Sequence, residues 1–313
     1  MRVAFLGNAP WSVPSLEALA DSSHDVGLVA TRVPRRAGRG GKLRPTAVAE
    51  AARRLSLPLA EVETVKSGPG FERLAGAEPD ALAVVAYGEI VPGEVLELPR
   101  VMPVNVHFSL LPELRGAAPV QRAIKEGLTA TGVTTMRMDQ GMDTGPILLQ
   151  QEEAIDDADD AGSLGARLAA IGARLLVDTL DRLEAGTLRE RPQDGALATY
   201  APKLKPDDEV IDWSTPADVV ARLVRALSPE PGGRTSFRGR VLKVFRATGE
   251  ALVATGNFPP GTVLATDRDR MVVATGSGLV AIEELQPEGR RRMTVAEFVR
   301  GYRPETGEVL GAR

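Results

Sequence analysis

The chain has 313 residues, of which 43% are hydrophobic and 26% charged, and its formal net charge is −4. This length suggests two domains, and the composition is typical of a folded globular protein. With no cysteine and only two histidines, His24 and His107, the sequence excludes disulfides and cysteine nucleophiles and disfavours a multi-histidine metal site. No apolar run reaches the roughly 18 residues of a transmembrane helix, and the apolar run after Arg2 is too short for a signal peptide.

The first half of the chain alternates apolar runs with stretches of helical period. The apolar runs predict strands over residues 2–6, 25–33, 81–87, 101–106 and 133–138, and the helical spacing predicts helices over residues 12–20, 46–55, 119–126 and 163–183. The run 81–87 is apolar throughout, which is typical of a central parallel strand buried on both faces. This alternation predicts an α/β fold with a doubly wound, mostly parallel sheet.

The second half changes character after Gly186, which is a predicted helix stop. Residues 187–208 are polar and contain three prolines, so we interpret them as a linker. Beyond them the sequence predicts a helix over 215–227, a closing helix over 294–299, and between them short strands over 235–237, 240–245, 261–265, 271–274 and 279–282. Short strands in series favour a small β-barrel. The predicted domains are therefore 1–186 and 209–313.

Basic side chains gather in two places on this acidic chain. Arg35, Arg36, Arg39, Lys42 and Arg44 lie between two prolines with no acidic residue among them. The segment is either a solvated flexible loop or an arm that contacts phosphates, because its glycines allow close backbone approach. A second basic run, residues 222–246, falls in the predicted second domain. This uneven distribution of charge predicts local basic patches on a protein whose net charge is negative.

One amide, one imidazole and one carboxylate are the strongest candidates for chemistry. Asn105 and His107 lie two residues apart at the end of a predicted strand, so their side chains point the same way. Asp143 follows the next predicted strand, and we expect two neighbouring strand ends to bring the three groups together at the carboxyl edge of the sheet. The trio suits acyl transfer, since amide and imidazole can donate to an oxyanion and the carboxylate can orient the imidazole.

Other interpretations of the same residues remain open at this stage. Asn105, His107 and Asp143 could instead be a capping amide, a structural histidine and a turn residue. A serine hydrolase triad with Ser109 is disfavoured, because no G-x-S-x-G elbow is present and Ser109 lies too close to His107. Neither a dinucleotide-binding fingerprint nor a P-loop is found in the glycine-rich segments.

Several longer stretches resemble the methionyl-tRNA formyltransferase family, within the folate-dependent formyltransferase superfamily. The clearest are residues 105–112 (NVHFSLLP), 115–123 (RGAAPVQRA) and 131–145, and the basic segment 37–43 and residues 200–204 (YAPKL) are also similar. The Asn–His–Asp trio belongs to the whole superfamily, whereas the RGAAP stretch, the basic loop and the second domain point to the tRNA-formylating members. Phe108 and the stretch GNAPW at residues 7–11 depart from the family pattern.

The resemblance implies transfer of the formyl group of 10-formyltetrahydrofolate to the methionine of initiator methionyl-tRNA, for translation initiation. It implies that Asn105 and His107 polarise the formyl carbonyl and that Asp143 holds His107. It also implies an OB-like second domain, a cytoplasmic monomer, and no metal or membrane. The residues expected to frame the folate are Ser109, Leu110, Leu111, Pro112, Ala86, Tyr87, Gly88 and Ile90, and those expected to contact tRNA are Arg36, Arg39 and Lys42.

Two alternative functions stay in view. A folate formyltransferase that acts on a small amine or sugar nucleotide would work without residues 209–313. A tRNA-binding module with an inactive first half would bind tRNA without turnover. The intact trio disfavours the second of these, and the basic loop and second domain disfavour the first.

Overall fold

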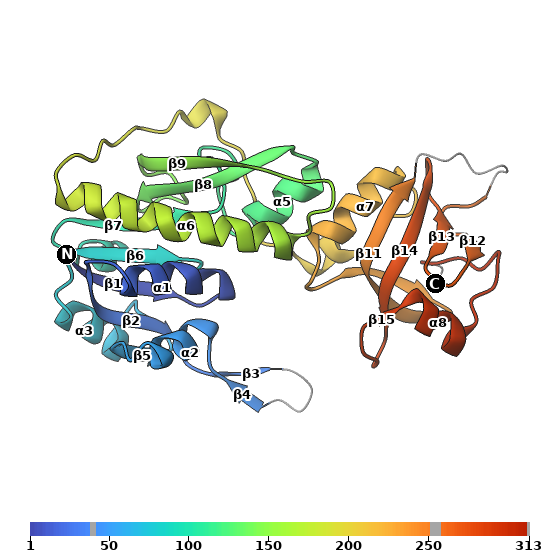
Figure 1. Ribbon diagram of the computed structural model, residues 1–313, viewed down its shortest axis with the longest axis horizontal. Helices are drawn as coiled ribbons and strands as arrows, with labels where there is room; N and C mark the ends of the chain where they lie inside the picture. The colour runs from blue at the N-terminus through green and yellow to red at the C-terminus, as the bar shows by residue number, and fades with distance from the viewer. Residues whose placement is uncertain (38–41, 251–257, 312–313) are drawn as a thin grey trace. The chain divides into compact units, whose positions relative to one another are not determined.

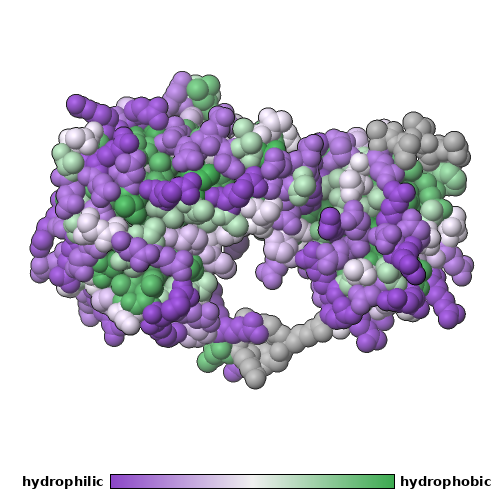
Figure 2. Space-filling model, in the orientation of Figure 1, coloured by the Kyte–Doolittle hydropathy of each residue, from purple (hydrophilic) through white to green (hydrophobic). Residues whose placement is uncertain are grey.

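The computed structural model describes residues 1–37, 42–250 and 258–311, and the chain divides into two compact units. The first unit comprises residues 1–119, 130–154 and 165–202, and the second comprises residues 120–129, 155–164 and 203–313. Within the described residues, none of the helices has the length and apolar character needed to cross a membrane. Figure 2 shows mainly hydrophilic side chains on the visible face, interrupted by small hydrophobic patches.

A seven-stranded sheet in the order β5–β2–β1–β6–β7–β8–β9 forms the centre of the first unit (Figure 1). The first five strands in that order run parallel, and β8 and β9 are antiparallel to their neighbours. Its strands are β1 (Arg2–Gly7), β2 (Asp25–Arg32), β5 (Leu59–Val62), β6 (Ala81–Val85), β7 (Met102–His107), β8 (Ala130–Arg137) and β9 (Ile147–Ala154). The predicted mostly parallel α/β sheet is confirmed.

Helices cover both faces of this sheet. One face packs against α3 and α4 through a cluster that includes Leu6, Leu82 and Val84. Helix α6 crosses the opposite face, where a Cβ on Gly172 would lie 2.8 Å from Val106. The helices of this unit are α1 (Val13–Ala20), α2 (Ala47–Arg54), α3 (Gly68–Gly76), α4 (Gly93–Leu96) and most of α6 (Ala161–Glu184), with short 3₁₀ turns η1 (Pro10–Ser12) and η2 (Gly195–Leu197).

The chain reverses direction across the sheet between β1 and β6. From β1 it proceeds to β2 and β5 on one side, and then returns to β6 and β7 on the other. In open α/β sheets ligands bind outside the carboxyl ends of the strands at such a switch point. The residues that follow β1 and β6 therefore occupy the ordinary ligand position of this fold.

Two short strands, β3 (Arg35–Ala37) and β4 (Lys42–Arg44), form an antiparallel hairpin that projects from the first unit (Figure 1). Residues 38–41 of this basic segment lie outside the described residues. The sequence predicted a loop here and not a ladder.

The second unit is built on an antiparallel sheet in the order β10–β11–β14–β13–β12, with β15 paired to β14. Over the described part of this unit no ladder joins β10 to β12, so these strands do not form a closed barrel. The predicted small domain of short antiparallel strands is confirmed. Its elements are α5 (Pro119–Glu126), η3 (Pro206–Glu209), α7 (Ala217–Ala226), β10 (Gly233–Phe237), β11 (Arg240–Glu250), β12 (Val263–Thr266), β13 (Met271–Ala274), β14 (Leu279–Pro287), β15 (Met293–Thr294) and α8 (Val295–Tyr302).

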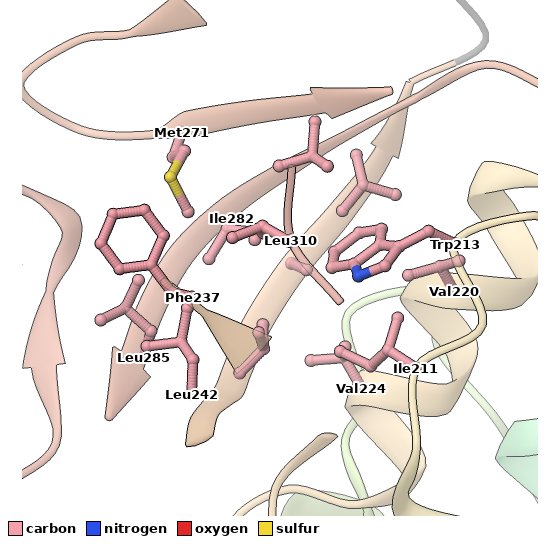
Figure 3. Packing of buried hydrophobic residues seen from close by; sticks show 14 of the residues in the cluster. Ile211, Trp213, Val220, Val224, Phe237, Leu242, Met271, Ile282, Leu285 and Leu310 are labelled. Carbon is pink, nitrogen blue, oxygen red and sulfur yellow. The ribbon is translucent and has the colours of Figure 1, made fainter. Parts of the chain in front are cut away.

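The core of the second unit lies between this sheet and helices α7 and α8. Figure 3 shows the part of it that packs against Val220 and Val224 of α7. Trp213 is buried there, and its indole Nε1 donates to Thr235 Oγ1 at 3.0 Å, which satisfies the one polar group of the ring. Phe298 stacks on Tyr302 with 4.7 Å between ring centroids. Trp213 is therefore a core anchor.

The irregular stretch 187–202 groups with the first unit. Its backbone pairs with the segment after β7, since Arg115 N donates to Thr199 O and Ala201 N donates to Arg115 O. Residues 203–208 group with the second unit. The boundaries 186 and 209 stay a prediction.

Candidate active site

Asn105 and His107 lie on one face of β7, as the two-residue spacing predicts. Asn105 pairs in register with Val84 of β6, and Val84 packs in the cluster with α3 and α4. Both polar side chains therefore lie on the face opposite α6. Asn105 is half-buried, and His107 is only 5% exposed. The imidazole is thus held in place by its surroundings.

Asp143 reaches His107 by a different route from the one expected. Strand β8 is antiparallel to β7, with Thr134 opposite His107 and Arg137 opposite Val104, so the carboxyl end of β8 lies beside the start of β7. The expectation of two neighbouring carboxyl ends was therefore wrong. Residues 138–146 instead fold back as a loop, which brings Asp143 Oδ2 to 3.7 Å from His107 Nδ1.

The hydrogen bonds of His107 define the state of its ring. His107 Nε2 lies 3.0 Å from the carbonyl oxygen of Leu114, and a carbonyl only accepts, so Nε2 carries a proton. Nδ1 then faces the Asp143 carboxylate, either as a lone pair or, when the ring is cationic, as a second N–H. The neutral ring can take a proton at Nδ1, and the cation formed is stabilised by the carboxylate.

The Asp143 carboxylate is itself oriented by backbone. The N–H of Gly116 donates to Asp143 Oδ2 at 2.8 Å, and the carboxylate side chain is 19% exposed. Asp143 has φ of 54°, in the left-handed region that costs a non-glycine residue about 1 kcal/mol or more. Strained backbone of this kind is typical of functional sites.

The segment after β7, which the sequence predicts to frame a ligand, is fixed by internal hydrogen bonds. Ser109 Oγ donates to Glu113 O at 2.6 Å, and Thr134 Oγ1 donates to Ser109 O at 2.7 Å. Leu111 N donates to Thr134 Oγ1 at 3.1 Å, and Gln150 Nε2 donates to Leu111 O at 2.8 Å. Ser109 and Leu111 are buried, so they shape the wall from behind. Leu110 and Pro112 are half-buried.

Residues 86–90 follow β6 at the switch point of the sheet. Ala86 has φ of 42°, and Gly88 has φ of 76°. The side chain of Tyr87 turns inward, and burial raises the pKa of its phenol to about 12, so the ring stays neutral. Gly88 and Ile90 are exposed, and Ile90 keeps 76% of its accessible surface.

Asn8 ties three strand ends together at this point. Its Nδ2 donates to Tyr87 O after β6, and its Oδ1 accepts from Thr31 Oγ1 and from Arg32 N at the end of β2, each at 2.9 Å. Arg32 also donates through Nε to Glu89 Oε1 at 2.8 Å. These bonds orient the loop 86–90. Sequence reasoning passed over Asn8, although it follows the first strand directly.

Two of the three residues expected to contact tRNA fall on the hairpin. Arg36 in β3 is exposed and pairs in register with Leu43 of β4. Lys42 begins β4 opposite Ala37, and Arg39 lies outside the described residues. The hairpin belongs to the same unit as the His107 site.

Gln193 and Arg115 join the site without having been predicted. Arg115 is 6% exposed, and its guanidinium donates to Gln193 Oε1. Gln193 in turn donates to the backbone of the Asp143 loop. Arg115 begins the RGAAP stretch that resembles the family, and this resemblance was a sequence signal that could have identified it as a site residue. Gln193 sits in a polar, irregular stretch with no sequence signal of its own.

A metal site finds no support in the described ranges, where no group of three or more His, Asp or Glu side chains is arranged to hold an ion. The expectation that no metal takes part stays a prediction. The candidate catalytic groups are the amide, imidazole and carboxylate named above.

Both halves of the chain match known protein families. The family described as formyl transferase matches residues 1–180, and that described as formyl transferase, C-terminal domain, matches residues 203–303. The methionyl-tRNA formyltransferase of Pelotomaculum thermopropionicum is 43% identical over 316 residues and covers 99% of each chain. That of Solibacter usitatus is 43% identical over 311 residues, also with 99% of each chain.

The chain belongs to the methionyl-tRNA formyltransferase family. Solved structures with lower identity agree on the fold of this formyltransferase. HypX from Aquifex aeolicus matches with a TM-score of 0.68 at 18% identity, over 98% of this chain and 48% of that longer one. The N-formyltransferase from Helicobacter canadensis, in complex with folinic acid and dTDP-3-aminofucose, matches with a TM-score of 0.64 at 18% identity, over 93% of this chain and 99% of that one.

Proposed function

We propose that this protein transfers the formyl group of 10-formyltetrahydrofolate to the amino group of methionine on initiator methionyl-tRNA, in the cytoplasm, for translation initiation. The support is the match with methionyl-tRNA formyltransferases at about 40% identity over the full chain, through both domains. The donor is a co-substrate, and the protein acts as a monomer.

Asn105 and His107 are the groups proposed to stabilise the developing oxyanion. The methionine amine attacks the formyl carbon, and the carbonyl oxygen gains negative charge as the C–N bond forms. The Asn105 amide donates to that oxygen. His107 donates to it through Nδ1–H once that nitrogen has taken the proton of the amine, because Nε2–H is already bound to Leu114 O. Donors fixed before the reaction are the most effective stabilisers of such charge, and His107 is held by burial and by Leu114 O.

The proton balance of the reaction closes within the site. The amine loses one proton on forming the amide, and N10 of the folate gains one as its bond to the formyl carbon breaks. His107 Nδ1 is placed to accept the first proton and Asp143 to stabilise the cation that results, at 3.7 Å. The net reaction consumes and releases no proton.

The donor is proposed to lie at the switch point, between residues 86–90 and residues 109–112. Ala86, Tyr87, Gly88 and Ile90 follow β6, and His107 ends the adjacent strand β7, so a group bound across the two strand ends lies beside the imidazole. Leu110 and Pro112 are the half-buried members of the opposite segment.

The tRNA is proposed to contact the basic hairpin and the second domain. Arg36 and Lys42 lie on β3 and β4, and with Arg39 they form a run of cations without acidic neighbours in the sequence. Cations of this kind bind phosphates and give salt-dependent affinity. Residues 209–313 are the proposed tRNA-binding domain, after a linker of 187–208.

The observation that carries the proposal is the Asp143–His107 contact beside Asn105, in a chain matched over its full length by this family. The test incubates the protein with 10-formyltetrahydrofolate and methionylated initiator or elongator tRNA, and detects formyl-methionine by mass spectrometry. We expect formylation of the initiator. His107→Ala should abolish it, whereas His24→Ala, at the other buried histidine, should not.

Two outcomes of that assay contradict the proposal. Formylation of small amines or sugar nucleotides in place of tRNA would move the protein to another branch of the superfamily. Binding of tRNA with no turnover by the wild-type chain would make it a binding module.

A further inference from the structure

The loop that carries Asp143 is held by a side chain remote from it in sequence. Gln193 Nε2 donates to the carbonyl oxygen of Asp143 at 2.8 Å and to that of Gly145 at 2.7 Å. On its other end, Gln193 Oε1 accepts from Nε of Arg115 at 3.1 Å and from Nη2 of the same guanidinium at 2.7 Å. The Gln193 amide thus bridges the loop that carries the catalytic carboxylate and the segment whose backbone donates to that carboxylate.

The orientation of this amide is determined by its partners. A guanidinium only donates and a carbonyl only accepts, so Oε1 faces Arg115 and Nε2 faces the loop. All four hydrogen-bonding positions of the side chain are used. Between residues 189 and 197 every other side chain is exposed, and Gln193 is the half-buried one. The inward turn of this side chain therefore serves the bridge.

The segment on the far side of the bridge also touches Asp143. Arg115 is 6% exposed, and the next residue, Gly116, donates its N–H to Asp143 Oδ2 at 2.8 Å. The residue before Arg115 is Leu114, and its carbonyl oxygen accepts a hydrogen bond from His107 Nε2 at 3.0 Å. Residues 114–116 therefore contact both the imidazole and the carboxylate, and Gln193 joins them to the backbone of Asp143.

The loop needs such an anchor. Asp143 has φ of 54°, so its own backbone does not favour the observed conformation. Hydrogen bonds to the carbonyl oxygens of residues 143 and 145 offset that strain. A carboxylate that moves by about 1 Å relative to its partner can cost a reaction about a hundredfold.

We infer that Gln193, acting with Arg115, is a positioning residue that sets the distance between Asp143 and His107. The side chain of Gln193 uses its hydrogen-bonding positions on Arg115 and on the backbone of the Asp143 loop, so it acts through those two partners. The inference rests on the proposed function, because it assigns a role in that site's chemistry.

The test uses Gln193→Glu in the full chain. The glutamate keeps the contact with Arg115, so the buried guanidinium retains an acceptor, but it places an oxygen against the two carbonyls and removes both donors. Gln151→Glu, at an exposed position of β9, makes the same chemical change away from the site. Arg115→Lys weakens the bridge from its other end and serves if Gln193→Glu does not fold.

The first readout needs no substrate. The chain has only two histidines, so histidine-selective isotope labelling gives two sets of imidazole NMR signals, and His24→Asn assigns them. We expect the His107 signals to shift in Gln193→Glu and the His24 signals to stay. Unchanged His107 signals in a folded variant overturn the inference, and so do equal changes at both histidines, which would mean a general structural role.

The second readout is the kinetics of formyl transfer. We expect kcat to fall about tenfold to a hundredfold in Gln193→Glu while KM for both substrates stays within about twofold. Gln151→Glu should match the wild type. An unchanged kcat overturns the inference. If the wild-type chain transfers no formyl group to tRNA, the proposed function fails, and the NMR readout still decides whether Gln193 positions the pair.

Discussion

The indole of Trp11 meets the ring of Phe108 edge to face, with 6.0 Å between ring centroids and an interplanar angle of 85°. Trp11 lies in the turn after β1, and Phe108 directly follows His107 at the end of β7. Both residues lie in the two stretches that we noted in the sequence as departures from the family pattern. The two departures are in contact, so they form one packing unit behind the strand end that carries His107.

The packing of Trp11 requires a glycine on helix α6. A Cβ at Gly165 would lie 2.2 Å from Cζ2 of the indole, which is rigid and cannot move aside cheaply. Gly165→Ala should therefore destabilise the protein by about 1–3 kcal/mol, although alanine favours a helix by about 1 kcal/mol over glycine. Trp11→Leu in the same chain should recover most of the loss. Urea unfolding measures both.

The matched control for that experiment is Gly76→Ala in α3, where an added Cβ would meet no atom within 4 Å. This variant should be as stable as the wild type or slightly more so. Equal stability of Gly165→Ala and the wild type would contradict the packing argument.

The Asn105 amide should contribute to the rate and little to stability. Asn105→Ala is expected to lower kcat about 10²–10³-fold, the usual cost of removing one oxyanion donor. The side chain is half-buried, so the melting temperature should change little. Steady-state kinetics with initiator methionyl-tRNA, together with a melting curve, test this. A loss confined to KM would assign the amide to substrate binding.

The basic hairpin should govern the salt dependence of tRNA binding. Arg39→Ala with Lys42→Ala is expected to weaken binding and to reduce the slope of log K against log salt by up to about 2, since each phosphate that a cation neutralises adds close to one unit to that slope. The charge-matched control is Arg53→Ala with Arg54→Ala on α2. There Arg53 forms an ion pair with Glu61, and Arg54 forms one with Glu17. The same slope in both double variants would leave the hairpin as ordinary surface.

The second unit should lose part of its stability in acid through Asp208. The N–H of Lys205 donates to the Asp208 carboxylate at 2.9 Å, and this bond, with the cations of Arg122 and Lys125 at 3.3 and 3.4 Å, holds the pKa of that carboxyl below its usual value. A carboxyl with a depressed folded pKa stabilises the fold above the unfolded value of about 3.9. The contribution is lost as pH falls through the folded pKa.

Asp208→Asn should therefore lower the free energy of unfolding by about 1 kcal/mol at pH 7. The difference from the wild type should shrink as pH falls below about 3.9. Chemical denaturation between pH 7 and pH 3 measures it. Asp207→Asn, at the exposed neighbouring carboxylate, is the control and should have little effect throughout. A difference that grows in acid would reverse the sign of the argument.

Elements with a strong local pattern were predictable, and those without one were not. The fully apolar run of β6 and the helical period of α5 were found from the sequence because burial on one or both faces imposes those patterns. Strand β9 was missed because it lies at the sheet edge, where half of its residues are polar and none of those four is buried, so no apolar run marks the strand. Strand β5 has only four residues, and α3 begins with Gly-Pro-Gly, which resembles a turn.

The sequence by itself determined which chemical groups are available and which of them share a face. Asn105 and His107 lie two residues apart on a strand, and the period of a strand places them together whatever surrounds them. Tertiary structure decided the rest. The antiparallel direction of β8 sends Asp143 away from His107, and a strained loop held by Gly116 and Gln193 brings it back. Contacts between residues so distant in sequence depend on how the chain folds back on itself, which no local pattern records.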